Sequence, residues 1–255
     1  MMRWTAILLA GSRPGRDRFA ESFGTDLKAL IPIAGEPMVR RPVRALLDCK
    51  VIGDIHVLAQ EPERIAAVLP NDPRLHVAPS RSTIAETLLA VCADPATVWP
   101  LLVTTADHAL LTPEMIAQFC ARSARTDIAI GVVARRRVLR RLPRTRRTWY
   151  RFRGGAFSGA NLFILRTAKV APVIEKWRAV EQDRKQALKL LWTLGPMLFL
   201  GAALRLRSID ATLSRVSRRM RMAIRAVELT DGLAAVDVDK AADQRLVECI
   251  VQGRK

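Results

Sequence analysis

In the first half of the chain, short apolar runs alternate with stretches whose apolar positions recur at helical spacing. Short apolar runs bounded by Gly, Pro or charged residues predict buried strands, over 4–10, 52–59, 74–78, 98–105 and 127–134. Apolar positions at helical spacing, or a Ser, Thr or Pro start signal, predict intervening helices, over 37–49, 61–69, 82–92 and from 112 onward. Strands alternating with helices predict a three-layer α/β/α, Rossmann-like fold with a mainly parallel sheet.

The regular alternation stops after residue 134. Ten arginines lie among the nineteen residues of 135–153, together with Trp149, Tyr150 and Phe152. A strand is predicted over 157–165, helices from 168 to about 217, one or two strands over 227–238 and an amphipathic helix over 240–252. We interpret 1–255 as one α/β domain with a basic and apolar insertion over about 135–217.

The insertion contains a charge-free stretch, Leu190 to Leu204. Fifteen helical residues rise about 22 Å, short of the roughly 30 Å of a hydrocarbon core. A buried core helix and a helix lying in a membrane interface both fit it better than a span.

The net charge and the cysteines indicate which class of partner and which cellular compartment to expect. The net charge is +18, which predicts a polyanionic partner. For the arginine-rich segment, a solvated charge run, nucleic-acid binding and attraction to an anionic membrane surface all stay open; nucleic acid is disfavoured because no recognition motif accompanies the charge. Four dispersed cysteines without a CxxC pair predict buried, reduced thiols. We expect a cytoplasmic protein, with a peripheral position on the inner face of the membrane as a hypothesis.

The first strand runs into a loop suited to a polyphosphate. The apolar run ends at Leu9-Ala10 and gives way to Gly11-Ser12-Arg13-Pro14-Gly15-Arg16, followed later by Lys28. Glycine lets backbone N–H groups approach a ligand closely, and the cations offset phosphate charge. Neither GxxxxGK[ST] nor GxGxxG is present, so the two glycine-based phosphate motifs are excluded.

This opening resembles that of the nucleotidyltransferases with a glycosyltransferase-A-like fold, and in particular their MobA-like NTP transferase branch. The family pattern is a strand, an LAGG loop with an arginine, and then K-P-L-L-P-I-x-G-K-P-M. Its counterparts here are Leu9-Ala10-Gly11-Ser12 and Lys28 through Met38. The resemblance implies an NTP donor, with CTP or GTP favoured, and Mg²⁺ as cofactor. It also implies that Lys28, with Arg13 or Arg16, contacts the phosphates.

The candidate metal ligands are aspartates in two parts of the chain, Asp107 and the pair Asp237 and Asp239. Asp107 follows an apolar strand, where ligands of open α/β sheets bind, and the alternative is a helix cap. Asp237 and Asp239 alternate in a predicted strand, so both side chains should share one face. The resemblance places metal ligation on Asp107 and Asp239. For Asp239 the alternative is again an N-cap, and Asp243 is expected to stabilise the first turn of the last helix.

Further assignments come from the resemblance. It places Ser82 and Thr83, with Ser80 and Thr87, where relatives bind base and ribose, although capping is the simpler interpretation. Gly159 and Asn161 resemble an acceptor-binding G-x-N segment, with a turn as the alternative. For His108, next to Asp107, a position in the core or on the surface is favoured, with an approach to the site as the alternative.

The function expected from these residues is nucleotidyl transfer. An NMP group would pass from an NTP to a phosphorylated small-molecule or lipid-derived acceptor, with release of pyrophosphate. The alternatives are a nucleotide-sugar glycosyltransferase on the same scaffold and a non-catalytic protein that binds membranes or nucleic acid.

Overall fold

The computed structural model describes residues 3–11, 17–182 and 207–253, and within these residues eight strands form one sheet. The strand order is β10-β7-β9-β6-β1-β4-β5, with β8 paired to β9. The strands are β1 (Trp4–Leu9), β4 (Ile52–Ala59), β5 (Leu75–Pro79), β6 (Leu101–Thr105), β7 (Ile128–Ala134), β8 (Tyr150–Phe152), β9 (Gly155–Leu165) and β10 (Ile224–Glu228). A two-stranded ribbon adds β2 (Pro32–Ile33) and β3 (Glu36–Pro37).

Parallel pairing dominates the sheet. Strand β1 pairs in parallel with β4 and β6, β4 with β5, and β7 with β10. Only β9 runs against its neighbours β6, β7 and β8. The predicted fold class, α/β with a mainly parallel sheet, is confirmed.

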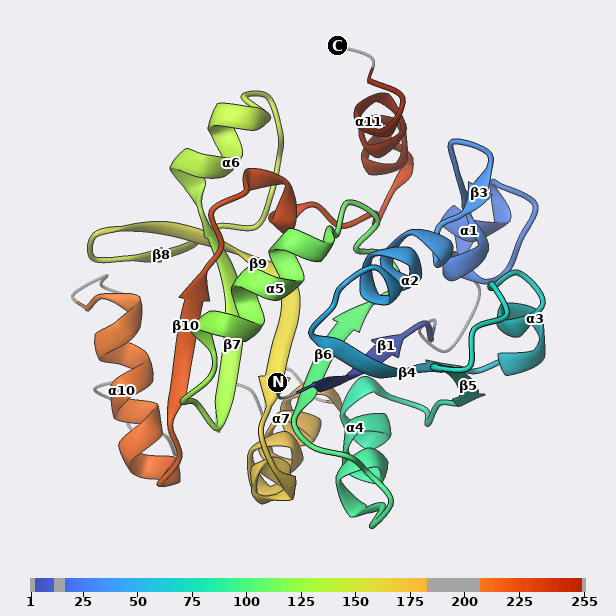
Figure 1. The fold of residues 1–255 in the computed structure, drawn as a ribbon. Helices are drawn as coiled ribbons and strands as arrows, with labels where there is room; N and C mark the ends of the chain where they lie inside the picture. The colour runs from blue at the N-terminus through green and yellow to red at the C-terminus, as the bar shows by residue number, and fades with distance from the viewer. Residues whose placement is uncertain (1–2, 12–16, 183–206, 254–255) are drawn as a thin grey trace.

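Helices cover both faces of the sheet (Figure 1). One apolar cluster joins the sheet to α2 (Arg40–Leu47), α3 (Pro62–Ala66), α5 (Pro113–Arg122), α6 (Arg135–Arg141) and α11 (Ala241–Val251). A second cluster, on the other face, joins it to α4 (Ile84–Ala93), α7 (Ala171–Gln182) and α10 (Ile209–Met220). The remaining helical segments are α1 (Arg18–Glu21) and the 3₁₀ turns η1 (Lys28–Leu30), η2 (Ala168–Val170) and η3 (Gly232–Ala235).

Local sequence signals explain where two of these helices begin. The side chain of Thr83 accepts a hydrogen bond from the N–H of Glu86 at the start of α4. Thr112 does the same for Met115 at the start of α5, and Pro113 occupies the first turn, where a missing N–H costs nothing.

The structure differs from the prediction in the arginine-rich segment. Part of it is regular: α6 begins at Arg135, and β8 forms a hairpin with β9. Helix α6 forms because Val138 is fully buried against the sheet while most of its arginines face solvent.

A second difference concerns residues 227–238, where β10 ends at Glu228 and η3 follows in place of another strand. Gly232 brings this turn onto the backbone of α6: a Cβ there would lie 2.4 Å from the carbonyl oxygen of Arg137. The apolar stretch Leu190 to Leu204 lies outside the described residues.

Two smaller observations complete the fold. Cys49 and Cys120 are buried and Cys92 is half-buried, but Cys249 is exposed, so the expectation of a buried thiol is wrong there. Among the described helices, none is both long and apolar enough to cross a bilayer.

Candidate active site

Three segments far apart in the sequence meet at the carboxyl edge of the sheet. Asp107 follows β6, Lys28 opens η1, and Asp239 lies just before α11. The Nζ atom of Lys28 is 2.7 Å from Oδ2 of Asp107 and 2.6 Å from Oδ1 of Asp239. The three residues singled out from the sequence for phosphate and metal binding therefore lie in one cluster.

The cluster is electrostatically coupled. Burial disfavours charge on both Lys28 and Asp107, but their mutual attraction and hydrogen bonds outweigh it. The pKa of Lys28 is therefore raised and the pKa of Asp107 is lowered, so both groups stay ionised near neutral pH. Asp239 is the accessible member, with 64% of its side chain exposed against 19% for Asp107.

Neighbouring groups fix the direction of the Asp107 carboxylate. Thr105 donates a hydrogen bond from Oγ1 to Oδ1 of Asp107 at 2.5 Å, and Nδ2 of Asn161 lies 3.4 Å from the same oxygen. The backbone N–H of Val238 donates to the carbonyl oxygen of Asp107 at 3.1 Å. This last bond joins the turn after β6, which carries Asp107, to the segment that carries Asp239. Thr112, rather than Asp107, caps the following helix.

Asp237 and Asp239 do not act as a pair, which corrects the strand-based expectation. Because residues 236–239 form no strand, the two side chains have different partners. Asp237 is paired with Arg147, whereas Asp239 is paired with Lys28. Burial, followed by the charges of Asp239 and Asp107, raises the pKa of Asp237 despite the attraction of Arg147. The capping alternative for Asp239 is also wrong, because Lys240 is the N-cap residue of α11.

The glycine-rich loop begins beside the cluster. Leu9 pairs with Thr105 across β1 and β6, so Ala10 and Gly11 leave the sheet next to Asp107. A Cβ on Gly11 would lie 3.5 Å from Oγ of Ser80 and 3.8 Å from the side chain of Gln60, which places three strand ends around one point. Ser12, Arg13 and Arg16 lie outside the described residues.

The two threonines near α4 have local partners. Thr83 caps the helix, Thr87 donates to the carbonyl oxygen of Thr83 at 2.8 Å, and Ser82 is exposed. Ser80 differs, because its Oγ is buried and has no hydrogen-bond partner among the described residues.

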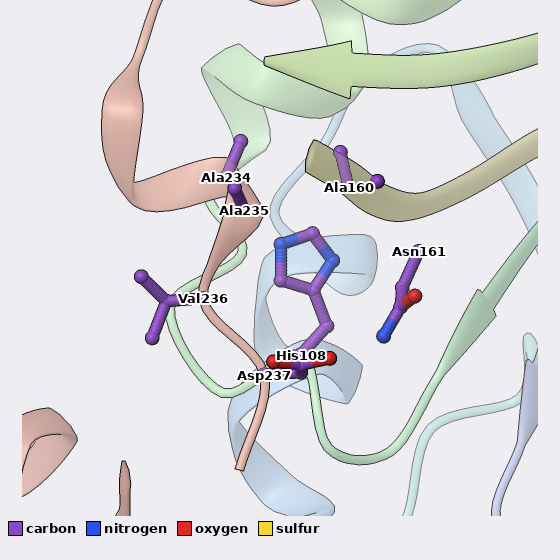
Figure 2. Close-up of a pocket in the computed structure, with 8 residues that line it drawn as sticks. His108, Ala160, Asn161, Ala234, Ala235, Val236 and Asp237 are labelled. Atoms are coloured by element: carbon purple, nitrogen blue, oxygen red, sulfur yellow. The ribbon is translucent and has the colours of Figure 1, made fainter. Parts of the chain in front are cut away.

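A small pocket lies around the ring of His108 (Figure 2). Gly159 and Asn161 of β9 line it together with Asp237 and the backbone of η3. In this structure it is too small to hold even a water molecule, so it is not a ligand cavity of the usual kind. Asn161 has φ +45°, a left-handed conformation, at an irregularity in the pairing of β7 and β9.

Sequence reasoning missed three residues of this region. Gln60 follows β4 and Thr105 ends β6, and their position at strand ends could have identified them, as it identified Asp107. Arg147 carried no such signal, because nine other arginines surround it in the sequence of the basic segment.

Several solved structures share this architecture. A hypothetical transferase from Thermus thermophilus is 29% identical with a TM-score of 0.80, over 95% of this chain and 100% of that one. A 4-diphosphocytidyl-2C-methyl-D-erythritol synthase from Anaerococcus prevotii is 10% identical with a TM-score of 0.61, over 98% and 96%. A CMP:2-keto-3-deoxy-manno-octonic acid synthetase complexed with CTP is 13% identical with a TM-score of 0.61, over 98% and 99%. The fold is thus one that nucleotidyltransferases use.

The sequence comparison identifies the family. Residues 6–227 match the MobA-like NTP transferase domain, and the chain belongs to this family. It is a nucleotidyltransferase-type enzyme, in agreement with the resemblance of its first residues. No curated protein sequence matches it.

Proposed function

We propose that this enzyme transfers a nucleoside monophosphate from an NTP to a phosphorylated acceptor and releases pyrophosphate. The observation that carries the proposal is the convergence of Lys28, Asp107 and Asp239 at the sheet edge where Gly11 leaves β1. This edge is where open α/β sheets bind their ligands.

Mg²⁺ fits the donor set as the proposed cofactor. No group of three or more His, Cys, Asp or Glu side chains suited to a metal occurs in the described parts of the chain. Mg²⁺ does not need one, because it binds through one or two carboxylates and completes its shell with water and substrate phosphates. Asp107 and Asp239 would hold it, and when bound it would neutralise charge on the phosphates.

The remaining steps need position and charge rather than a strong base. An oxygen of the acceptor phosphate is already ionised; it attacks the α-phosphorus while the bond from that phosphorus to the pyrophosphate oxygen breaks. Lys28 would offset the charge that accumulates on the leaving pyrophosphate. Backbone N–H groups from Leu9 to Ser12, with Arg13 or Arg16, would hold the triphosphate.

For the nucleoside, the sequence resemblance implies contacts from Ser82 and Thr83. The structure supports a partly different choice of residues. The buried, unpartnered Oγ of Ser80 lies beside Gly11 and Gln60, whereas Thr83 is engaged in capping. We propose Ser80 and Gln60 as base or ribose contacts, with Ser82 as an accessible neighbour. CTP and GTP, which the sequence resemblance favours, are the donors to test first; a CTP complex is known for one structure of this fold.

On the acceptor side, Asn161 is proposed to bridge the acceptor and Asp107. Its amide is within 3.4 Å of the carboxylate and also lines the small pocket with Gly159.

A polyanionic partner is proposed for the basic face formed by α6, β8 and α10. No acidic residue occurs between Asp127 and Glu175, and the N–H of Arg153 donates to the carbonyl oxygen of Arg207 at 2.9 Å, which links the β8–β9 hairpin to the start of α10. Among the described residues, this face exposes Arg135, Arg136, Arg140, Arg141, Arg144, Arg146, Arg151, Arg153, Arg218, Arg219 and Arg221. We propose an anionic membrane surface as the partner, which suits a lipid-derived acceptor.

Pyrophosphate release tests the proposed reaction. The protein is incubated with each NTP, Mg²⁺ and a panel of phosphorylated acceptors. Asp107→Asn should lower turnover by roughly 100- to 1,000-fold, since it removes a preorganised charge at the reacting phosphates. Asp48→Asn, which changes an exposed carboxylate at the end of α2, is the matched control and should behave like wild type. Full activity in Asp107→Asn would contradict the proposed role.

A further inference from the structure

Arg147 stands apart from the other arginines of the basic segment. Only 7% of its side chain is exposed, whereas its neighbours Arg144 and Arg146 are exposed. It comes from the loop between α6 and β8, and its side chain reaches across to the segment that precedes α11.

The contacts of Arg147 bracket Asp239 in the sequence. On one side, Nη1 pairs with the carboxylate of Asp237 and donates to its carbonyl oxygen at 3.2 Å. On the other side, Nη2 lies 3.4 Å from Oδ1 of Asp243, whose side chain is only 10% exposed. A single guanidinium therefore holds both ends of the seven-residue segment 237–243.

The same segment is tied to the site from within. Oδ2 of Asp243 accepts the N–H of Asp239 at 3.3 Å, and the N–H of Val238 donates to the carbonyl oxygen of Asp107. Asp239 itself is mostly exposed, and Lys28 is the single ion-pair partner of its carboxylate among the described residues. Its position depends on the backbone that Arg147 and Asp243 fix.

Burial of this guanidinium is not explained by its own hydrogen bonds. Its Nε and Nη2 atoms are buried without a hydrogen-bond partner in the part of the chain that the structure describes. Buried donors without partners are costly, so it is the pairing with the two carboxylates that offsets the burial of Arg147.

We infer that Arg147 is a positioning residue of the active site: by clamping Asp237 and Asp243, it holds the carboxylate of Asp239 opposite Asp107. This inference rests on the proposed function for its catalytic consequence. Its structural part, the clamp, can be tested without turnover.

The first measurement is hydrogen–deuterium exchange of the peptide that covers residues 236–243, with no nucleotide present. In Arg147→Gln its exchange should become at least tenfold faster, because the N–H groups of Val238 and Asp239 lose their fixed partners. Arg146→Gln removes the adjacent exposed charge and should exchange as wild type does. Unchanged exchange in Arg147→Gln would refute the clamp, as would an equal increase over the whole chain.

The second measurement is the Mg²⁺ dependence of pyrophosphate release. Loss of a group that orients a metal ligand typically lowers metal affinity 10- to 100-fold, so Arg147→Gln should need about 10- to 100-fold more Mg²⁺ for half-maximal turnover. Arg147→Lys keeps the charge but not the planar fork and should fall between wild type and Arg147→Gln. Faster local exchange with an unaltered Mg²⁺ requirement would reduce Arg147 to a stabilising role and overturn the inference.

These outcomes separate the inference from the proposed function. If the wild-type protein releases no pyrophosphate with any NTP and acceptor, the proposed reaction fails, and the exchange experiment alone decides on the clamp. If Arg147→Gln does not fold, Arg147→Lys replaces it in both measurements, with smaller changes expected in the same direction.

Discussion

His108 follows the central carboxylate of the site, yet its ring belongs to the core. Figure 2 shows the ring directed between Ala160 and the η3 backbone, and the residue is 1% exposed. Its Nδ1 lies 3.5 Å from Oγ1 of Thr104. Burial lowers the pKa of His108 to about 4, although the nearby Asp107 acts in the opposite direction. His108 is therefore neutral at the pH where the enzyme would work.

This buried ring should make the protein sensitive to mild acid. Unfolding would restore a pKa near 6.5, so between about pH 6.5 and 4 the unfolded chain binds more protons and stability falls as the pH falls. The full loss from this one group is about 3 kcal/mol. In His108→Gln, the free energy of unfolding measured in urea should depend less steeply on pH over this range. An identical slope in wild type and variant would contradict the prediction.

At the scale of elements, the irregularity in β9 is the feature that presents Asn161 to the site. Ile130 pairs with Phe163 and Val132 with Gly159, so residues 160–162 of β9 face Gly131 alone. Gly131 permits this, because a Cβ there would lie 3.0 Å from Cβ of Leu162. Such bulges redirect a side chain at the cost of a strained backbone.

Because Asn161 has a positive φ, replacing it by alanine and by glycine should have different effects on the free energy of unfolding. Glycine accepts a positive φ freely, whereas alanine is disfavoured there by roughly 1–2 kcal/mol. Asn161→Ala should therefore be about 1 kcal/mol less stable than Asn161→Gly in urea denaturation. Equal stabilities would show that the left-handed conformation is not maintained.

The elements that the sequence predicted best are those whose side chains face the sheet. The strand expected over 52–59 matches β4, and the helix over 82–92 matches α4 to within two residues, because apolar spacing and a threonine cap are local signals. Helix α6 and turn η3 were missed because each depends on the other: Val138 and Gly232 become informative only once the two segments are in contact.

The same distinction applies to the site. Lys28, Asp107 and Asp239 could be selected because a family motif or the end of a strand marked each of them. The different partners of Asp237 and Asp239, and the proposed role of Arg147, arise from contacts between distant segments. The spacing of residue types along the sequence does not reveal such contacts.

At the scale of the whole molecule, the +18 charge is unevenly placed. The basic face of α6, β8 and α10 follows the β10 end of the sheet (Figure 1), away from β4 and β5, with α6 and α10 packed on the two opposite faces of the sheet. An attraction to acidic lipid therefore has a defined orientation rather than a uniform one.

Vesicle co-sedimentation tests this orientation. Wild-type protein should bind vesicles that contain acidic lipid at low salt and be released as ionic strength rises. Reversing Arg140 and Arg141 to Glu should weaken binding strongly, since each basic residue contributes about 1 kcal/mol near such a surface.

Arg3→Glu with Lys50→Glu alters net charge equally at exposed positions beside β1 and β4, outside the basic face, and should bind nearly as wild type. Equal losses in both double variants would indicate a response to net charge alone. Preference for a nucleic acid over acidic vesicles would contradict the membrane proposal.

The contact between Lys28 and Asp239 spans 211 positions of the sequence, against 79 for Lys28 and Asp107. During synthesis the amino-terminal part of a chain can fold while the rest is still being made. A growing polypeptide would then hold the first ion pair but lack the carboxylate that completes the centre. The complete centre would therefore form only late, after the segment that carries Asp239 has folded onto the rest of the chain.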